Sequence, residues 1–367
     1  MSLLFSPLQL RSLELANRIQ VSPMCQYSAV DGSMNDWHLM HYGSLALSGA
    51  GLLVMEATHV TAQGRITHGC SGLYSDENQA ALDRVLRFCR AHSAIAIGVQ
   101  LGHAGRKASS ERPWEGRGSL AAAAGPWPVA GASAVPFAEG WPSPAVLDRA
   151  GLRSVRDAFV RSTERAAALG FDLVEVHSAH GYLLSTFLSP LSNRRSDEYG
   201  GSLENRMRFP LETFAAMRAA WPADRPMGVR IHGSDWIDGG WTVQDAVAYA
   251  AALKALGCDY VTVSSGGVAA SAQIPVGPGY QVPLADVVRR ETGLVTCAVG
   301  MITGAAQAEA IVAQGHADQV ALARAMLFNP HWPWAAAAAL GAPVTQPPPY
   351  ARAGAATWGG TIPTGAT

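Results

Sequence analysis

Short apolar segments and longer segments with helical spacing alternate along this chain, and the alternation repeats eight times. The apolar segments predict strands at residues 19–22, 52–56, 94–101, 171–177, 228–231, 260–264, 294–299 and 319–323. The segments between them predict helices at residues 37–48, 77–92, 152–169, 203–220, 243–256, 283–290 and 305–314, with a terminal helix after the last strand. Because βα crossovers are right-handed, eight such units in succession predict an α/β fold closed into a (β/α)8 TIM barrel.

An open, doubly wound sheet is the alternative arrangement for alternating strands and helices. A sheet of that kind that binds a dinucleotide carries a GxGxxG motif after an early strand, and no such motif follows one here. The barrel is therefore the predicted fold, with residues 1–334 as one domain.

Three segments lie outside the eight units. Residues 5–15 predict a small hairpin before the first strand. Residues 102–150 are rich in Pro, Gly, Ala and Trp and are too long for an ordinary connection, so we expect a functional loop. In a barrel this loop leaves the end of the third strand where active sites lie, and it should cap the site. Residues 335–367 form a C-terminal tail.

Composition excludes several classes of partner. The formal net charge is −1, which argues against nucleic acid or an anionic membrane as the main partner. No apolar run approaches the roughly 18 residues that a membrane span needs. The five cysteines are odd in number and dispersed, as expected of reduced thiols, and the first residues lack the features of a signal peptide. These features predict a cytoplasmic protein.

The stretch FDLVEVHSAHGY, residues 171–182, concentrates polar chemistry at the end of an apolar strand. Its last residues include His177, His180 and Tyr182. In a barrel, residues that follow the strands share one mouth. The other predicted strand ends contribute Pro23, Met24, Cys25, Tyr27, Glu56, Ala57, Gln100, His103, Arg230, Ser265–Gly267, Gly300, Met301, Ala323 and Arg324.

These residues favour a flat heterocycle with a phosphate tail. Barrels commonly bind phosphate after strands seven and eight, where Gly300 permits close backbone approach and Arg324 offers a bidentate guanidinium. Arg230 lies in an apolar strand and needs an acceptor. Other interpretations stay open: Cys25 as a small buried hydrophobe, Arg324 as an exposed helix-start residue, and the two histidines as half of a metal site that lacks a strong third ligand.

Several longer motifs resemble those of a known family. They are NRIQVSPMCQYSA, WHLMHYGSLA, QLGHAGRKA, EVHSAHGYLLSTFLSPLSNRRSDEYGGSLENRMRF, GVRI and VALARAML. Over essentially its whole length the chain resembles the Old Yellow Enzyme family of FMN-dependent ene-reductases. It is most similar to the bacterial branch of xenobiotic reductase A and the thermophilic-like enzymes.

The resemblance implies a role for each matching residue. The isoalloxazine ring would contact Ser22, Pro23, Met24, Cys25, Ala57, Gln100 and Arg230, with Gly300, Met301, Ala323 and Arg324 completing the cofactor site through the phosphate. His177 and His180 would hydrogen-bond the substrate oxygen, Tyr182 would donate a proton, and Tyr27 would line the substrate side. Ala323 stands where the family usually has Gly, and it supplies the same backbone N–H if its φ is negative.

The implied activity is NAD(P)H-dependent reduction of activated C=C bonds in enones, enals and maleimides, with nitro compounds as a further class. FMN would be the cofactor, and NADPH or NADH the hydride donor. The alternatives are a metal-dependent barrel hydrolase built on His177 and His180, or a non-catalytic flavin-binding module. The resemblance also implies a homodimer or a tetramer of dimers, in which Trp358 lines the partner's substrate pocket and Arg352 anchors the tail.

Overall fold

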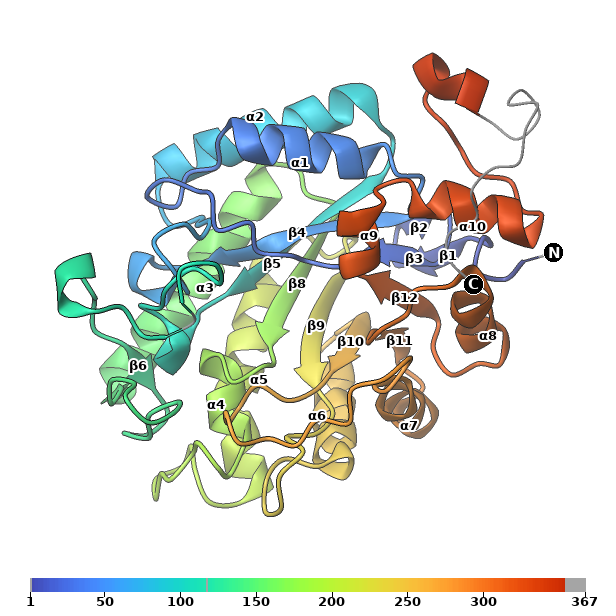
Figure 1. Cartoon of the computed structure of the whole chain (residues 1–367). Helices are drawn as coiled ribbons and strands as arrows, with labels where there is room; N and C mark the ends of the chain where they lie inside the picture. Colours follow the sequence, from blue (N-terminus) through green and yellow to red (C-terminus); the bar gives the residue numbers. More distant parts are fainter. Residues whose placement is uncertain (1, 117, 354–367) are drawn as a thin grey trace.

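Eight parallel strands form a closed barrel in the computed structural model, which describes residues 2–116 and 118–353 (Figure 1). In barrel order the strands are β3 (Ile19–Val21), β4 (Leu52–His59), β5 (Ala96–Gly102), β8 (Leu173–Ser178), β9 (Met227–His232), β10 (Tyr260–Ser264), β11 (Val295–Ala298) and β12 (Gln319–Leu322). Strand β12 pairs with β3 and closes the ring. The predicted (β/α)8 barrel is confirmed.

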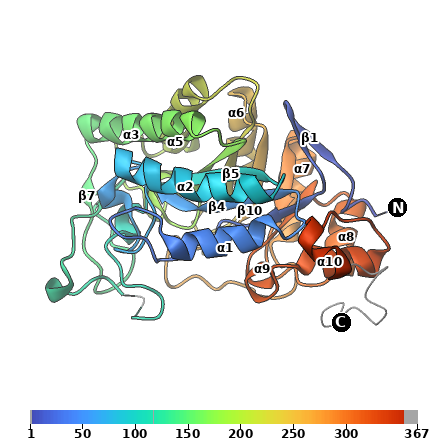
Figure 2. The same ribbon diagram turned by 90° about the horizontal axis from the view of Figure 1, so that it is seen from above.

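The long helices lie outside the strands, as Figure 2 shows from above. They are α1 (Asp36–Ala46), α2 (Asp76–His92), α3 (Arg149–Ala168), α5 (Leu203–Ala220), α6 (Val243–Ala255), α7 (Val282–Thr292), α8 (Ala305–Ala313) and α10 (Trp332–Leu340). Helix α3 begins three residues earlier than predicted because the side chain of Asp148 caps it, accepting a hydrogen bond from the backbone N–H of Gly151.

Two short helices follow strands at the mouth of the barrel. Helix α4 (Leu183–Leu188) was not predicted because all six of its residues are buried and it has no polar face from which to read a helical period. After β12 come α9 (Arg324–Phe328) and α10, in place of the one terminal helix that was predicted. The expected start of the tail at residue 335 falls inside α10, where Ala335, Ala336 and Ala337 are buried.

Strand β4 is longer than predicted. Its register with β5 shifts between Met55 and Ala57, which makes Glu56 the extra residue of a β-bulge. The strand continues to His59, whose backbone N–H donates to the carbonyl of Ser71. Both Glu56 and Ala57 therefore lie within β4, whereas the strand was predicted to end at residue 56 with Ala57 after it.

The N-terminal hairpin closes the amino end of the barrel. Strands β1 (Leu8–Leu10) and β2 (Leu13–Leu15) pair antiparallel, as predicted. Leu10 and Leu15 pack with apolar side chains at the amino ends of the barrel strands, among them Leu52 and Leu173. This packing leaves the carboxyl end of the barrel as the open mouth.

The segment between β5 and α3 lies over one side of that mouth. It contains the two-residue strands β6 (Ala130–Gly131) and β7 (Ala145–Val146) and the 3-10 helices η2 (Gly105–Lys107) and η3 (Ala122–Ala124). Two further 3-10 helices lie elsewhere in the described residues: η1 (Ala62–Gly64) after β4 and η4 (Pro348–Ala353) after α10. The guanidinium of Arg106 donates to the carbonyls of Val135 and Pro136, and also to that of Val268 in the loop after β10. One buried arginine therefore joins the long segment to the barrel mouth.

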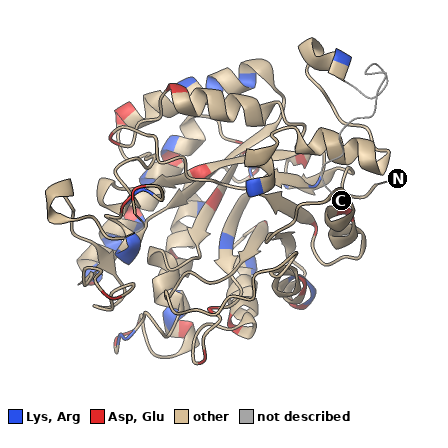
Figure 3. Cartoon of the chain, in the orientation of Figure 1, with Lys and Arg blue, Asp and Glu red and all other residues tan. Residues whose placement is uncertain are grey.

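Charged residues are interspersed around the barrel. Figure 3 shows both the basic and the acidic residues scattered over the outer helices and the loops. Within the described ranges 2–116 and 118–353, no helix combines the length and the apolar character that crossing a membrane requires.

Candidate active site

Side chains that alternate along the barrel strands bring the predicted site residues together at the carboxyl end. In β8, Val174 and Val176 pack against the outer helices, so Glu175 and His177 face the barrel interior. His177 is paired in register with Arg230 of β9, and Gln100 of β5 is paired with Glu175. The barrel therefore places Gln100, His177 and Arg230 on one interior surface, although they are far apart in the sequence.

His177 and His180 contact each other at the end of β8. Their ring centroids lie 5.1 Å apart at an interplanar angle of 82°. The backbone N–H of Ala179 donates to Nδ1 of His177 at 3.2 Å, which assigns the proton of that ring to Nε2. This Nε2 lies 3.4 Å from Nδ1 of His180, whose Nε2 lies 2.7 Å from Oγ of Ser264.

Both imidazoles are neutral at pH 7. Burial, followed by the nearby Arg230 guanidinium, lowers the pKa of His177 and of His180 well below the ordinary value. Ser264 Oγ donates in turn to Oε1 of Gln281 at 3.1 Å. In this arrangement His180 donates through Nε2 to Ser264 and accepts at Nδ1 from His177.

Tyr182 completes the cluster. Its ring packs edge-on against His177, with the centroids 4.9 Å apart. The ammonium of Lys107 lies 5.1 Å from the centre of the Tyr182 ring and also donates to the carbonyls of His180 and Gly267. Burial, with smaller effects from Cys25 and Cys70, raises the pKa of the Tyr182 phenol, so this hydroxyl stays protonated.

The loop that carries Cys25 and Tyr27 is held by a buried carboxyl. Glu56 accepts hydrogen bonds from the backbone N–H of Gln26 at 3.1 Å and from Tyr42 Oη at 3.0 Å. Tyr27 adopts a positive φ of 52°, an uncommon conformation that this anchoring supports. Burial, followed by Cys70 and Glu56, raises the pKa of the Cys25 thiol well above its ordinary value, so Cys25 is a neutral thiol.

Glu56 should make the stability of the protein pH-dependent. Burial raises its pKa from 4.5 to about 7, with Gln26, Tyr42 and Ser71 opposing the rise and His38 Nε2 3.5 Å away. The folded state therefore binds a proton that the unfolded state has released. The contribution of Glu56 to the free energy of unfolding is therefore largest below about pH 4.5. It is lost as the pH rises through about 7, and the total loss is roughly 3 kcal/mol.

The measurement is urea unfolding of the wild type and Glu56→Gln at about pH 5 and pH 8. The amide in the variant cannot ionise, so the wild type should lose more stability than the variant between these two values. Burial lowers the pKa of His38, the histidine beside Glu56, to about 4, so His38 stays neutral between these two pH values. Histidines remote from Glu56 titrate equally in both proteins. Exposed Glu14→Gln is the matched control. Parallel curves for the wild type and Glu56→Gln would contradict the assignment.

The residues expected around a heterocycle offer a fitting set of donors. Arg230 Nη1 donates to Ser22 Oγ at 3.0 Å, while its buried Nε has no hydrogen-bond partner among the described residues. Gln100 is buried, and its Nε2 donates to Glu175. An unpaired guanidinium N–H and an oriented amide, with the small Ala57 beside them in the adjacent strand, suit a planar ring that carries oxygen and nitrogen acceptors.

The expected phosphate residues lie at the ends of β11 and β12. Gly300 and Met301 both have positive φ, 112° and 49°. Ala323 has a φ of −109°, so Ala is compatible with its backbone and its N–H is retained. Arg324 opens α9 and is exposed. Pro23 and Met24 are half-buried in the loop after β3. Trp358 lies outside the described residues.

Several residues that the fold brings to this site were not among those predicted from the sequence. Lys107, Glu175 and Gln281 touch Tyr182, Gln100 and the serine beside His180, respectively. Glu175 could have been found, because it precedes His177 by two residues and therefore lies on the same face of the strand. Gln281 precedes α7 and carries no comparable pattern.

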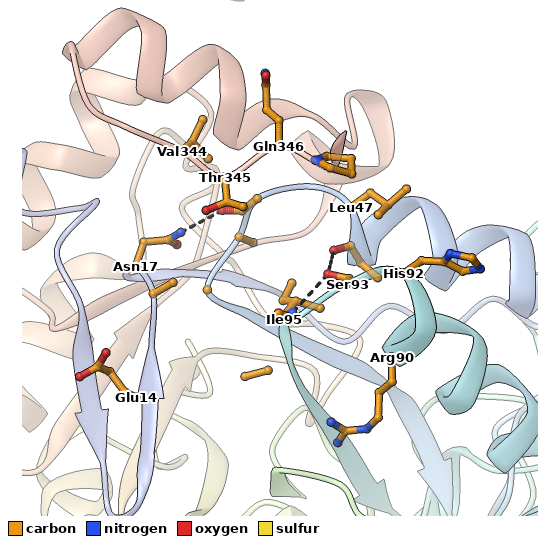
Figure 4. Close-up of a pocket in the computed structure, with 18 of the residues that line it drawn as sticks. Glu14, Asn17, Leu47, Arg90, His92, Ser93, Ile95, Val344, Thr345 and Gln346 are labelled. Carbon is orange, nitrogen blue, oxygen red and sulfur yellow. Dashed lines mark hydrogen bonds between the residues drawn. The ribbon is translucent and has the colours of Figure 1, made fainter. Parts of the chain in front are cut away.

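A separate cavity of about 760 Å³ lies at the opposite end of the barrel (Figure 4). Its walls include Asn17, Gly51, Ile95 and Asp172, each just before a barrel strand, and the segment 343–348. This places it at the amino ends of the strands, away from the histidines. In the part of the chain that is described, no three His, Cys, Asp or Glu residues are grouped so that they could hold a metal ion.

Comparisons with known proteins identify the family of the chain. Residues 3–341 match the NADH:flavin oxidoreductase / NADH oxidase family. The chain is 46% identical over 353 residues to the NADPH dehydrogenase of Geobacillus thermodenitrificans, covering 96% of this chain and 98% of the relative. It is 41% identical to the NADPH dehydrogenase of Listeria innocua, covering 96% and 99%.

A solved structure of morphinone reductase in complex with tetrahydroNAD is also similar. Its TM-score is 0.76 at 27% identity, covering 94% of this chain and 93% of that one. The family match spans nearly the whole chain, and the residues at the mouth of the barrel are compatible with a flavin. The chain therefore belongs to the NADH:flavin oxidoreductase / NADH oxidase family, the Old Yellow Enzyme family, and is an NAD(P)H-dependent flavin oxidoreductase.

Proposed function

We propose that this enzyme reduces activated C=C bonds in enones, enals and maleimides, and nitro compounds as a further class, in the manner of the xenobiotic reductase A and thermophilic-like branch. The observation that carries the proposal is the cluster of two neutral imidazoles and a protonated phenol, with centroid distances of 5.1 and 4.9 Å. Such a cluster can bind a carbonyl oxygen and deliver a proton near it.

FMN is the proposed cofactor, with NADPH or NADH as the hydride donor. When bound, FMN supplies the hydride chemistry. Arg230, Gln100, Ala57 and residues 22–25 would hold its ring system, and the ends of β11 and β12, with Gly300, Met301, Ala323 and Arg324, would hold its phosphate. The unpaired Nε–H of Arg230 supports this proposal because a ring acceptor would satisfy it.

The histidines would bind the substrate oxygen. An oxygen between the two rings would accept from Nε2–H of His177. His180 can donate to the same oxygen when its proton moves to Nδ1, because Ser264 Oγ–H can then donate to the vacated Nε2. Both rings are neutral, so neither is an acid strong enough to replace Tyr182 as the proton donor.

We expect His177→Ala and His180→Ala to weaken the binding of phenols and enones by roughly 10- to 150-fold. Each removes one hydrogen bond to an oxygen that carries negative charge, worth about 1.5–3 kcal/mol. The measurement is titration of each variant with a phenol, followed by flavin absorbance. His316→Ala, an exposed histidine outside the mouth, is the control. Unchanged phenol affinity in both variants would remove the histidines from the substrate site.

The activity itself is tested by NAD(P)H oxidation. Under anaerobic conditions an enone should be required for turnover, and one saturated ketone should form for each NAD(P)H consumed. Consumption of NAD(P)H only in the presence of oxygen, without a reduced ketone, would contradict the proposal. Running both nicotinamides in the same assay would identify the preferred donor.

The proposed assembly is a homodimer or a tetramer of dimers in the cytoplasm. The beginning of the tail is anchored, because Tyr350 packs edge-on against His331 and Trp334. From there Arg352 would anchor the remaining tail and Trp358, outside the described residues, would line the partner's substrate pocket. The five free cysteines are consistent with a reducing compartment. A monomeric mass by light scattering would contradict the assembly.

A further inference from the structure

A buried carboxylate lies directly behind the proposed cofactor site. Glu175 is fully buried in β8 and faces the barrel interior. It accepts hydrogen bonds from Gln100 Nε2 at 2.7 Å, Tyr260 Oη at 3.0 Å and Thr262 Oγ1 at 2.7 Å. All three groups are donors to it, and only the ionised form of a carboxyl group is purely an acceptor. The arrangement therefore stabilises a negative charge inside the barrel.

The barrel is built to bring these donors together. Gly228 of β9 lies between Glu175 and Tyr260 in register. A Cβ at Gly228 would collide with the Tyr260 ring. Only a residue without a side chain lets this ring cross β9 and place its hydroxyl on Glu175. Glycine at this position is explained by the bond between Tyr260 and Glu175, whose strands lie on either side of β9.

Glu175 fixes the orientation of Gln100. A flipped Gln100 amide would place its oxygen against the carboxylate, so the Nε2 must face Glu175 and Oε1 must face elsewhere. The second N–H and Oε1 of Gln100 are then available to a ring that carries both a donor and an acceptor. Glu175 would thus fix the orientation of the Gln100 amide without contacting the ring itself.

Glu175 and Arg230 carry charges of opposite sign and act in opposite directions on groups that lie near both. The two residues lie on adjacent strands, since Gly228 pairs with Glu175 and Arg230 pairs with His177, the next inward-facing residue. Burial raises the pKa of the Cys297 thiol, the nearby Glu175 raises it further, and Arg230 lowers it. Among the described residues, Glu175 bonds Gln100, Tyr260 and Thr262 and Arg230 bonds Ser22, so the two charged groups have separate partners.

We infer that Glu175 is a positioning residue that orients Gln100 toward the cofactor and lowers the reduction potential of the flavin through its buried negative charge. The inference rests on the proposed FMN site. A negative charge behind the ring disfavours the addition of electrons, because like charges repel each other more strongly in a buried site than in water. Removing the charge while keeping the size of the side chain should therefore make the flavin easier to reduce.

The test is Glu175→Gln, with the midpoint potential of the bound FMN as the main readout. We expect a higher potential, with the two-electron equilibrium shifted about tenfold, or about 30 mV. Thr262→Val is the matched control, because it removes one hydrogen bond to Glu175, leaves the charge in place but less compensated, and should lower the potential. An unchanged potential in Glu175→Gln, or an equal rise in Thr262→Val, would overturn the inference.

Tyr260→Phe provides a second variant if Glu175→Gln does not fold. It takes one donor from the carboxylate, leaves the charge less compensated, and should lower the potential. A potential equal to the wild type would overturn the inference. Wild-type protein that binds no FMN would overturn the proposed function itself, and this failure is distinct because it precedes any comparison of variants.

Discussion

Replacing Tyr182 by Phe should slow the reduction of an enone by roughly 10²–10⁴-fold, the usual contribution of a general acid. Both neighbouring imidazoles are neutral, whereas the phenol of Tyr182 is protonated and packs on His177. The Lys107 ammonium beside the ring favours the phenolate that forms when the proton leaves. Flavin binding and reduction by NAD(P)H should stay nearly normal, because neither step needs this proton.

Stopped-flow measurement of the two half-reactions checks this result. Tyr27→Phe is the control, since Tyr27 is the other phenol in the apolar wall that contains Cys25 and Tyr182. A normal oxidative half-reaction in Tyr182→Phe, with a slow one in Tyr27→Phe, would assign the proton to Tyr27. Equal slowing of both half-reactions would indicate a disturbed site and no acid role for Tyr182.

Arg230→Met should weaken FMN binding by roughly 10- to 150-fold, the equivalent of one charge-assisted hydrogen bond of about 1.5–3 kcal/mol. Among the described residues, Arg230 makes one side-chain hydrogen bond, to Ser22, and its buried Nε has no partner. Methionine removes this unsatisfied group, so the cofactor-free barrel should be as stable as the wild type or more stable.

Equilibrium titration with FMN and thermal unfolding of the cofactor-free protein separate these two effects. Arg225→Met is the matched control, because Arg225 donates to the carbonyls of Ala167 and Phe171, near the amino end of β8. That variant should lose stability and keep its FMN affinity. Loss of stability in Arg230→Met with unchanged FMN affinity would mean that Arg230 is a structural residue.

The barrel and much of the site were predictable because local patterns determine them. Eight apolar strands that alternate with helices close into a (β/α)8 barrel, and polar residues at the carboxyl ends of the strands then lie around one mouth. His177, His180 and Tyr182 follow from the end of a single strand. Gln100 and Arg230 follow from polar residues in buried strands, which need partners.

The remaining features depend on contacts between distant segments. The bulge at Glu56 depends on pairing with β5 and carries no signal in its own strand. The link from His180 through Ser264 to Gln281 joins three elements whose spacing in sequence says nothing about distance. The bond from Tyr260 to Glu175 depends on a glycine in the strand between them.

An anaerobic redox titration of the purified protein tests the central proposal most directly. We expect yellow protein with one FMN per chain, bleached by NADPH or NADH and restored by one equivalent of an enone. Colourless protein that carries stoichiometric zinc, or bound flavin that an enone does not reoxidise after reduction by NAD(P)H, would contradict it.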